Sequence, residues 1–213
     1  MAMKPVSTSV WIGELTLDKL QHEMHVSENE LAYLQQLVNL RSKKRQIQSP
    51  KDAGYARPSV IIDNFLYHGE LKHAENKYLL NGLNIGHIIN VSDCPLQQDI
   101  LDHFNVLWIN LDDAFGVDIS QYFETTNEFL NICKKKDEKV LVHCQMGISR
   151  SSTIVLAYLL KYHYDSLANA YDYLVERRRF AAPNHSFFLQ LIRYERKLYE
   201  KPDVNKPPTI DKK

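Results

Sequence analysis

Short apolar runs alternate with longer amphipathic segments along most of this chain. Five runs rich in β-branched or aromatic residues predict strands near 59–62, 65–68, 86–91, 105–110 and 139–143. Segments whose apolar positions recur at helical spacing predict helices near 71–82, 119–135, 149–163, 166–178 and 185–199. Because strands separated by crossover helices pair in parallel, we expect an α/β fold with a central, mostly parallel five-stranded sheet flanked by helices.

Residues 1–55 are expected to form a helical extension ahead of this pattern. Ser27 and Glu30 have the spacing of a capping box, and an apolar face (Leu31, Leu34, Leu37, Val38) follows. The basic run 43–45 suits a C-terminal helical turn better than a localisation or docking signal. The turn-like stretch 49–54 marks a boundary, so the main domain is expected at 56–200, followed by a disordered, proline-containing tail at 201–213.

Composition and charge narrow the class of protein. The chain has 213 residues, 44% of them apolar and 24% charged, with a formal net charge of zero. This balance favours neither a nucleic-acid-coating protein nor a binder of anionic membranes. No apolar run approaches the roughly 18 residues of a membrane span, and the first residues resemble neither a signal peptide nor a myristoylation site. Three cysteines, an odd number, fit a reducing compartment, so we expect a cytoplasmic or nuclear location.

The segment 140–152, VLVHCQMGISRSS, carries the most specific chemistry. An apolar strand ends at Cys144, a helical pattern begins near Ser149, and a tight loop connects them. Its backbone N–H groups can converge on one anion at a helix N-terminus, and Gly147 allows a backbone conformation that a residue with a Cβ resists. We expect a phosphate-binding loop made of His143, Gln145, Met146, Gly147, Ile148 and Ser149 around the cysteine.

This loop predicts phosphate-ester hydrolysis through a cysteinyl-phosphate intermediate. The field that binds phosphate also stabilises a thiolate, so Cys144 is the expected nucleophile. Arg150 can clasp two phosphoryl oxygens with its planar guanidinium, which a lysine cannot reproduce. The Ser151 hydroxyl lies near the sulfur and is suited to easing thiolate departure when water attacks the intermediate. A metal ion or cofactor is not expected in this reaction.

The thiols and the histidine beside Cys144 have other interpretations. Neighbouring strand residues point to opposite faces, so His143 cannot readily form a protease-type dyad with Cys144 and is expected to buttress the loop. Cys133 and Cys94 are the kind of cysteines that pack as small apolar side chains. Cys94 is also a candidate partner for an oxidised Cys144, and Cys144 should oxidise before Cys133.

A carboxylic acid outside the loop must protonate the leaving group. Asp112, Asp113 and Asp118 all follow the strand near 105–110. Asp118 is expected to cap the next helix, and Asp113 is the preferred acid because it lies where a short segment can hang over the pocket. A one-residue shift would exchange it with Asp112, and both could also be solvated loop carboxylates.

Two further polar features are expected to be structural first. The arginines at 177–179 close a helix, where cations are favoured, and this outweighs a patch for acidic substrates. Asn184, which follows Pro183, is expected to cap the last helix.

The loop resembles the signature of the cysteine-dependent protein phosphatases, and residues 57–200 look like their dual-specificity branch, particularly its small, atypical members. Supporting matches include 88–92, 118–123, 155–159 and Pro183-Asn184. Met146, 170–173 and 176–178 are reminiscent of the slingshot group, whereas 159–163 and 191–195 look more like small MAP-kinase-phosphatase-like members. In the family pattern, the aspartate ahead of Tyr122 falls on Asp113, and Asn184 would also brace the loop.

The resemblance implies a catalytic domain at 56–200 that acts on phosphotyrosine and phosphoserine or phosphothreonine. Phosphoproteins would be its partners, with a MAP kinase or another signalling protein as a candidate. Two alternatives stay open. One is a phosphatase of a non-protein ester, such as a phosphoinositide, a glycan phosphate or an RNA 5′ end, although the loop side chains of Gln145, Met146 and Ile148 add no positive charge. The other is a phosphate-binding pseudoenzyme, which would gain little from an intact nucleophile.

Overall fold

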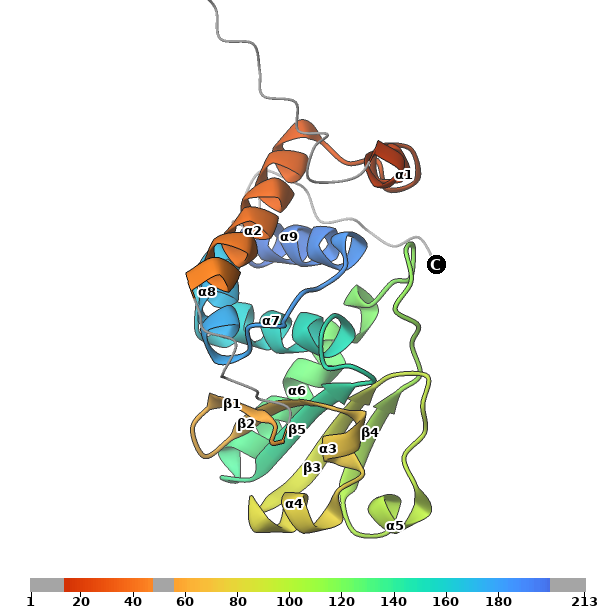
Figure 1. Cartoon of the computed structure of the whole chain (residues 1–213), viewed down its shortest axis with the longest axis vertical. Coiled ribbons are helices and arrows are strands. Elements are labelled where there is room, and N and C mark those ends of the chain that lie inside the picture. The colour runs from red at the N-terminus through yellow and green to blue at the C-terminus, as the bar shows by residue number, and fades with distance from the viewer. Residues whose placement is uncertain (1–13, 48–55, 200–213) are drawn as a thin grey trace, which may run out of the picture.

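The computed structural model describes residues 14–47 and 56–199 of the chain, with side chains described for 19–40 and 56–199 (Figure 1). The turn-like boundary expected at 49–54 and the tail expected at 201–213 lie outside the described residues. None of the helices in the described ranges is long and apolar enough to cross a bilayer.

A five-stranded sheet forms the centre of the molecule. Its strands are β1 (Ser59–Ile62), β2 (Leu66–Glu70), β3 (Ile85–Val91), β4 (Asn105–Ile109) and β5 (Lys139–Cys144). The order across the sheet is β1-β2-β5-β3-β4, and every pair is parallel except β1 with β2. This confirms the expected mostly parallel sheet, and it puts the strand that carries Cys144 in the middle.

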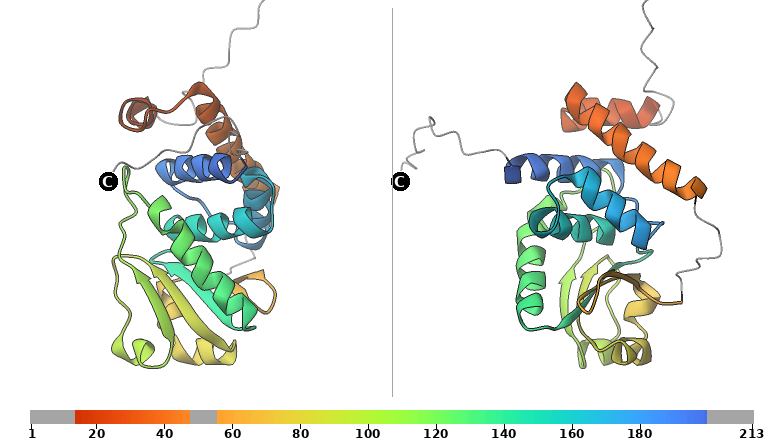
Figure 2. Two further views of the ribbon diagram at one scale, coloured as in Figure 1. Left: turned by 180° about the vertical axis from the view of Figure 1, so that it is seen from behind. Right: turned by 90° about the vertical axis from the view of Figure 1, so that its left-hand side faces the viewer.

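Helices cover both faces of this sheet (Figures 1 and 2). The short helices α3 (Leu71–Ala74), α4 (Lys77–Gly82) and α5 (Gln98–Leu101) lie on one face. The other face is covered by α6 (Phe123–Lys135) and α7 (Arg150–Tyr162), with α8 (Leu167–Arg177) and α9 (His185–Tyr199) packed on α7.

The central strand supplies both hydrophobic cores, because its side chains alternate between the two faces. Val140 and Val142 join the larger core under α6 and α7, while Leu141 joins the smaller one under α3 and α4. All three side chains are fully buried. A strand buried on both faces reads as one continuous apolar run, which is why its position could be predicted from the sequence.

The structure departs from the expected helices in three places. The helix expected at 71–82 is two helices, because the Asn76 side chain accepts a hydrogen bond from the Leu79 amide and starts α4 anew. The helix expected from 119 begins as a 3-10 turn, Ser120–Tyr122, and Asp118 accepts from the Ser120 amide there. The four-residue helix α5 was not predicted, since it is too short to show a periodicity.

The N-terminal extension contains α1 (Glu14–Met24) and α2 (Glu28–Ile47). The predicted capping box is present: the Ser27 amide donates to Glu30 Oε2 at 2.9 Å, and the Glu30 amide donates to Ser27 Oγ at 3.3 Å. Leu34 and Leu37 are fully buried and belong to the larger core beneath α8 and α9. The extension therefore completes the core of the domain.

Polar contacts also join α2 to α9. Arg193 Nε donates to Glu30 Oε1 at 2.9 Å, and Arg196 lies 3.6 Å from the same oxygen. Burial alone would raise the pKa of Glu30, but the hydrogen bonds from Arg193 and Ser27 hold that pKa below its ordinary value. Tyr33 adds a second link, because its hydroxyl donates to Glu195 at 3.2 Å.

We expect Leu37→Ala to lower the free energy of unfolding of the whole domain by about 2–5 kcal/mol, because it leaves a cavity in the shared core. Denaturant unfolding followed by circular dichroism would show one transition at a lower midpoint. Gln36→Ala, on the exposed side of the same turn, is the matched control and should leave the midpoint unchanged. An unchanged midpoint for Leu37→Ala would contradict the packing of α2 into this core.

Candidate active site

The loop that joins β5 to α7 has its carbonyl groups bonded to the surrounding protein. The Gln145 carbonyl accepts from the Leu71 amide, the Gly147 carbonyl from Arg178 Nε, and the Ile148 carbonyl from the Ala182 amide, at 2.7–3.2 Å. The loop ends at the N-terminus of α7, where backbone N–H groups lack helical partners. The Gly147 N–H donates to the Cys144 sulfur, and the other N–H groups of the loop can bind an anion, as expected for a phosphate-binding loop.

Gly147 has a conformation and surroundings that only glycine fits. Its φ is +61°, in the left-handed region. A Cβ built at this position would collide with the Gly69 carbonyl and the Arg178 guanidinium. The glycine thus allows strand β2 and Arg178 to approach the loop closely.

Cys144 lies at the floor of the loop and is 1% exposed. Its sulfur receives a hydrogen bond from the Gly147 amide at 3.2 Å and lies 3.1 Å from Ser151 Oγ. Ser151 Oγ lies in turn 2.8 Å from His68 Nε2 on strand β2. The two hydrogen-bonding groups at the sulfur can stabilise a thiolate.

His143 is buried on β5, the strand that ends at Cys144. Its Nδ1 lies 3.2 Å from the Cys144 carbonyl oxygen, and burial lowers its pKa to about 4. The imidazole is therefore neutral near pH 7. This geometry agrees with a buttress for the loop and gives the ring no contact with the Cys144 sulfur among the described hydrogen bonds.

Arg150 begins α7 and is 5% exposed. Its Nη1 donates to the Leu111 carbonyl at 2.8 Å and to Asp93 Oδ1 at 2.9 Å. The hydrogen bond from Arg150 lowers the pKa of the Asp93 carboxyl. Asp93 follows β3, at the carboxyl edge of the sheet, and was not predicted as a site residue. The sequence offered one indication of its role: Asp93 closely follows a buried strand, where site residues gather at the carboxyl edge of a parallel sheet.

Of the three candidate acids, Asp113 is the one that contacts the loop. Its Oδ1 accepts from Ser149 Oγ and from Asn184 Nδ2, both at 2.8 Å, and its Oδ2 lies 3.8 Å from Arg150 Nε. Asp112 is exposed and has no side-chain hydrogen bond or ion pair with the described residues. Asp118 is bonded to Ser120, away from the loop.

A family model described as "Dual specificity phosphatase, catalytic domain" matches residues 66–197. The chain belongs to the dual-specificity phosphatase family. The match begins on β2 and ends in α9, so it includes the loop, Asp113 and Asn184.

Named relatives agree with this membership. Human dual specificity protein phosphatase 5 is 37% identical over 150 residues, which cover 70% of this chain and 39% of that protein. Dual specificity protein phosphatase 1-A of Xenopus laevis is 40% identical over 137 residues, covering 64% of this chain and 37% of that protein. The chain thus spans well under half the length of these curated relatives.

This chain aligns with solved structures of similar fold over almost their whole length. Human DUSP28 aligns with a TM-score of 0.61 and 26% identity, over 66% of this chain and 94% of that chain. The human tyrosine phosphatase-like serine/threonine/tyrosine-interacting protein aligns with a TM-score of 0.61 and 28% identity, over 65% of this chain and 95% of that chain. These likenesses confirm the expected cysteine-phosphatase fold.

The arginines at 177–179 close α8 as expected, with Arg178 as the C-cap residue, and the tertiary structure adds a second role for Arg178. Arg177 lies in the last turn of α8, as expected. Arg178, however, is 6% exposed and donates from Nε to the Gly147 carbonyl at 2.7 Å. The helix ends at Arg177, and the chain then turns Arg178 toward the loop, so this arginine holds the dual-specificity phosphatase loop in place.

Asn184 has both of the roles expected for it. Its Oδ1 accepts from the Phe187 amide at 2.9 Å and caps α9. Its backbone N–H donates to Ser149 Oγ at 3.0 Å, and its side-chain Nδ2 donates to Asp113 Oδ1. Ser149 is thus bonded to both Asn184 and Asp113, which ties the loop to the segment that carries Asp113. Gln145 and Met146, by contrast, are exposed at the rim.

All three cysteines are free thiols. Cys94 is half-buried in the turn after β3, where its carbonyl accepts from Asn90 Nδ2 at 2.8 Å. Its neighbour Asp93 contacts Arg150, so this turn lies beside the N-terminus of α7, where the loop ends. Burial and the nearby Glu138 carboxylate raise the pKa of the Cys133 thiol to about 11.

Proposed function

We propose that this chain is a protein phosphatase that hydrolyses phosphotyrosine and phosphoserine or phosphothreonine through a cysteinyl-phosphate intermediate. The observation that carries the proposal is the convergence of Cys144, Arg150 and Asp113 on one loop at the carboxyl end of β5. Membership of the dual-specificity phosphatase family supports it. The geometry of these three residues suits each of them to a distinct role.

In the first step, the Cys144 thiolate attacks phosphorus. The S–P bond forms as the P–O bond to the leaving group breaks, and Asp113 transfers its proton to the departing oxygen. The loop N–H groups and the Arg150 guanidinium stabilise the charge on the equatorial oxygens. Arg150 is held for this task by the Leu111 carbonyl, and the phosphoryl group would compete with Asp93 for its Nη1.

In the second step, water attacks phosphorus and the S–P bond breaks. Asp113 accepts a proton from the water, phosphate leaves, and the thiolate is regenerated. Ser151, 3.1 Å from the sulfur, can donate its hydroxyl hydrogen to the departing thiolate. Ser149 and Asn184 orient the Asp113 carboxyl through both steps.

Phosphoproteins are the proposed partners, with a MAP kinase or another signalling protein as the candidate substrate, in the cytoplasm or nucleus. The exposed rim residues Gln145 and Met146 bring no positive charge to the pocket mouth, which favours a protein substrate over a polyanionic lipid headgroup. The three free cysteines suit a reducing compartment.

One purified preparation tests the proposal against its alternatives. Phosphotyrosine peptide, phosphothreonine peptide, a doubly phosphorylated kinase-loop peptide, phosphoinositide and 5′-phosphorylated RNA are compared for phosphate release, with Cys144→Ser as the blank. Turnover of both kinds of peptide, at kcat/KM above that for the lipid and the RNA, is expected. Preference for a non-protein ester would replace the proposed substrate class, and binding without turnover would identify a pseudoenzyme.

Asp113→Asn should slow hydrolysis of alkyl phosphates by about 10²–10⁴-fold, because their alkoxide leaving group needs a proton. Activated aryl phosphates should be affected much less. Asp112→Asn is the matched control on the preceding residue and should retain most activity toward both substrates. If the two variants rank in the opposite order, the acid is one residue away from the proposed position.

Cys144 should be oxidised by peroxide before Cys133, whose high pKa leaves it protonated. We propose that Cys94 then traps the oxidised sulfur, because its neighbour Asp93 contacts Arg150 at the end of the loop. Activity should return on thiol treatment in wild type and return less in Cys94→Ser. Equal recovery in both proteins, with no Cys94–Cys144 peptide in mass spectrometry, would rule out this bridge.

A further inference from the structure

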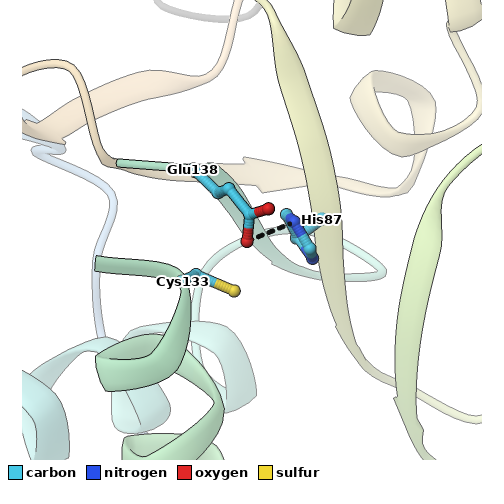
Figure 3. Close-up of side chains that lie close together, drawn as sticks. All are labelled: His87, Cys133 and Glu138. Carbon is cyan, nitrogen blue, oxygen red and sulfur yellow. Dashed lines mark ion pairs between the residues drawn. The ribbon is translucent and has the colours of Figure 1, made fainter. Parts of the chain in front are cut away.

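Three potential metal ligands gather at the edge of the sheet opposite the phosphate-binding loop (Figure 3). His87 lies near the start of β3, Cys133 in the last turns of α6, and Glu138 immediately before β5. One ligand atom from each lies within 4.8 Å of the other two, and His87 Nε2 lies 3.1 Å from Glu138 Oε2. Since Cys144 ends β5, the length of that strand puts roughly 20 Å between this cluster and the nucleophile.

Separate contacts hold each of the three side chains in position. The Glu138 amide donates to the Cys133 carbonyl at 3.0 Å, across a tight turn in which Asp137 has a φ of +55°. The His87 ring packs edge-on against Phe129, with ring centroids 5.9 Å apart. Cys133 is 2% exposed on the inner face of α6, and Figure 3 shows its sulfur directed toward the other two side chains.

Asn105 offers an outer contact of the kind that metal-bound histidines use. Asn105 Nδ2 lies 3.1 Å from His87 Nδ1 and donates to it. Turning the carboxamide by 180° exchanges Nδ2 for Oδ1, which then accepts from Nδ1–H and leaves the Nε2 lone pair for a metal. An ion pair between His87 and Glu138 would explain why these two side chains lie together. It would not explain why the buried Cys133 sulfur lies beside them.

We propose that His87, Cys133 and Glu138 bind a zinc ion, with water as the fourth ligand. Nitrogen, sulfur and carboxylate oxygen are the donors that Zn²⁺ takes in tetrahedral sites. Binding exchanges the thiol proton for a Zn–S bond and releases that proton to solvent. The ion would link α6, β3 and the start of β5, so its effect is on stability, and the proposed phosphatase chemistry does not require it.

Zinc binding is best measured in Cys144→Ser protein, because the catalytic thiolate could itself bind the metal. We expect about one equivalent of Zn²⁺ in competition with a chromophoric chelator, and a higher midpoint of thermal unfolding with zinc. Cys144→Ser/Cys133→Ser should lose both effects, and Cys144→Ser/Cys94→Ser should keep them. Co²⁺ in place of zinc should give a thiolate-to-metal charge-transfer band that depends on Cys133.

Absence of binding by Cys144→Ser protein, or equal binding by its Cys133→Ser variant, would overturn the proposal. Circular dichroism would show whether the double variant is folded. If Cys133→Ser unfolds the domain, His87→Gln provides the second test, since it removes a partly exposed ligand. Binding unchanged by His87→Gln would also count against the site.

A second observation concerns His68, and its interpretation rests on the proposed function. His68, Ser151 and Cys144 form a buried chain of contacts, with 2.8 Å from His68 Nε2 to Ser151 Oγ and 3.1 Å from that oxygen to the sulfur. All three residues are at most 1% exposed. A serine hydroxyl has one hydrogen, so it can donate to the sulfur or to the imidazole, and not to both.

The unused ring nitrogen decides between these two arrangements. His68 Nδ1 has no hydrogen-bond partner among the residues that the structure describes. If Nε2 carries the hydrogen, only a lone pair is left unsatisfied at Nδ1, whereas the other tautomer would bury an N–H without an acceptor, which is rarer in proteins. We infer that His68 is a positioning residue whose Nε2–H donates to Ser151 and thereby directs the serine hydrogen to the sulfur.

Burial, with Arg178 and two further histidines nearby, holds the pKa of His68 well below its ordinary value. The ring is therefore neutral and donates without titrating in the working pH range. Its effect falls on the second chemical step, in which the thiolate departs.

Burst kinetics with an activated aryl phosphate test this role. His68→Leu should slow steady-state turnover by about ten- to a hundredfold, the value of one hydrogen bond to a charged group, and should leave a larger burst because the intermediate accumulates. Ser151→Ala should behave alike, the double variant should be no slower than either single one, and His68→Gln should recover part of the rate through its amide N–H.

Unchanged steady-state and burst rates in His68→Leu would overturn the role of His68 while the phosphatase proposal stands. Slower turnover with no rise in burst amplitude, or additive losses in the double variant, would indicate a merely structural histidine. A wild-type protein without turnover on any phosphate ester would instead refute the proposed function itself.

Discussion

Cys144→Ser is expected to abolish turnover and to leave phosphopeptide binding largely intact. The serine hydroxyl is not ionised near neutral pH, so the S–P bond of the proposed intermediate has no counterpart. The Gly147 amide, the rest of the loop and Arg150 are unchanged by the substitution, because the loop is held by Leu71, Arg178 and Ala182 through its carbonyls. Ground-state binding therefore persists after the reaction is lost.

Phosphate release and peptide binding by calorimetry, measured on the same preparation, check this expectation. Cys94→Ser is the matched control: it removes a thiol near the loop but outside the reaction, and it should retain normal turnover. Residual activity of Cys144→Ser within tenfold of wild type would be incompatible with covalent catalysis. Loss of binding together with turnover would mean that the substitution disrupted the loop.

Arg150→Lys is expected to lower kcat/KM by about 10²–10³-fold, comparable to loss of a donor that stabilises transition-state charge. The guanidinium is buried, and the Leu111 carbonyl fixes one of its nitrogens. A planar fork held in this way can bind two phosphoryl oxygens at once, whereas an ammonium group acts as a single point charge. Retention of the positive charge should therefore not rescue catalysis.

The loss should appear mainly in kcat, since the equatorial oxygens gain charge in the transition state. Arg177→Lys is a suitable control, because Arg177 is exposed in the last turn of α8 and its contacts among the described residues are with Tyr173 and Glu176 of its own helix. It should leave kcat/KM unchanged. A decrease of only a few-fold in Arg150→Lys would mean that the charge alone suffices.

The amino-acid sequence by itself predicted the sheet and the central part of the site. β5 lies in the middle of the sheet and is buried on both faces, so it reads as an uninterrupted apolar run. The proposed nucleophile Cys144, Gly147 and Arg150 lie within seven consecutive positions, and a strand-to-helix turn brings such neighbours together whatever the rest of the fold does. The spacing of Cys144, Gly147 and Arg150 was therefore informative without long-range contacts.

Tertiary structure alone decided which distant residues meet this loop. His68 and Arg178 are separated by 110 positions in the chain. His68 was expected in a strand and Arg178 at the end of a helix, and neither expectation indicates that the side chain turns toward the loop. The packing of α2 on α9, which joins Glu30 to Arg193, was equally invisible.

The same holds for the cluster of His87, Cys133 and Glu138, which comes from a strand, a helix and the start of another strand. The physical reason is that periodicity reports which face of an element is apolar, and capping patterns report where it ends. Neither reports which other element a buried polar side chain will meet. That pairing is set by the packing of whole layers, and it is the packing that makes the hydrogen bonds of His68, Arg178 and Glu30 possible.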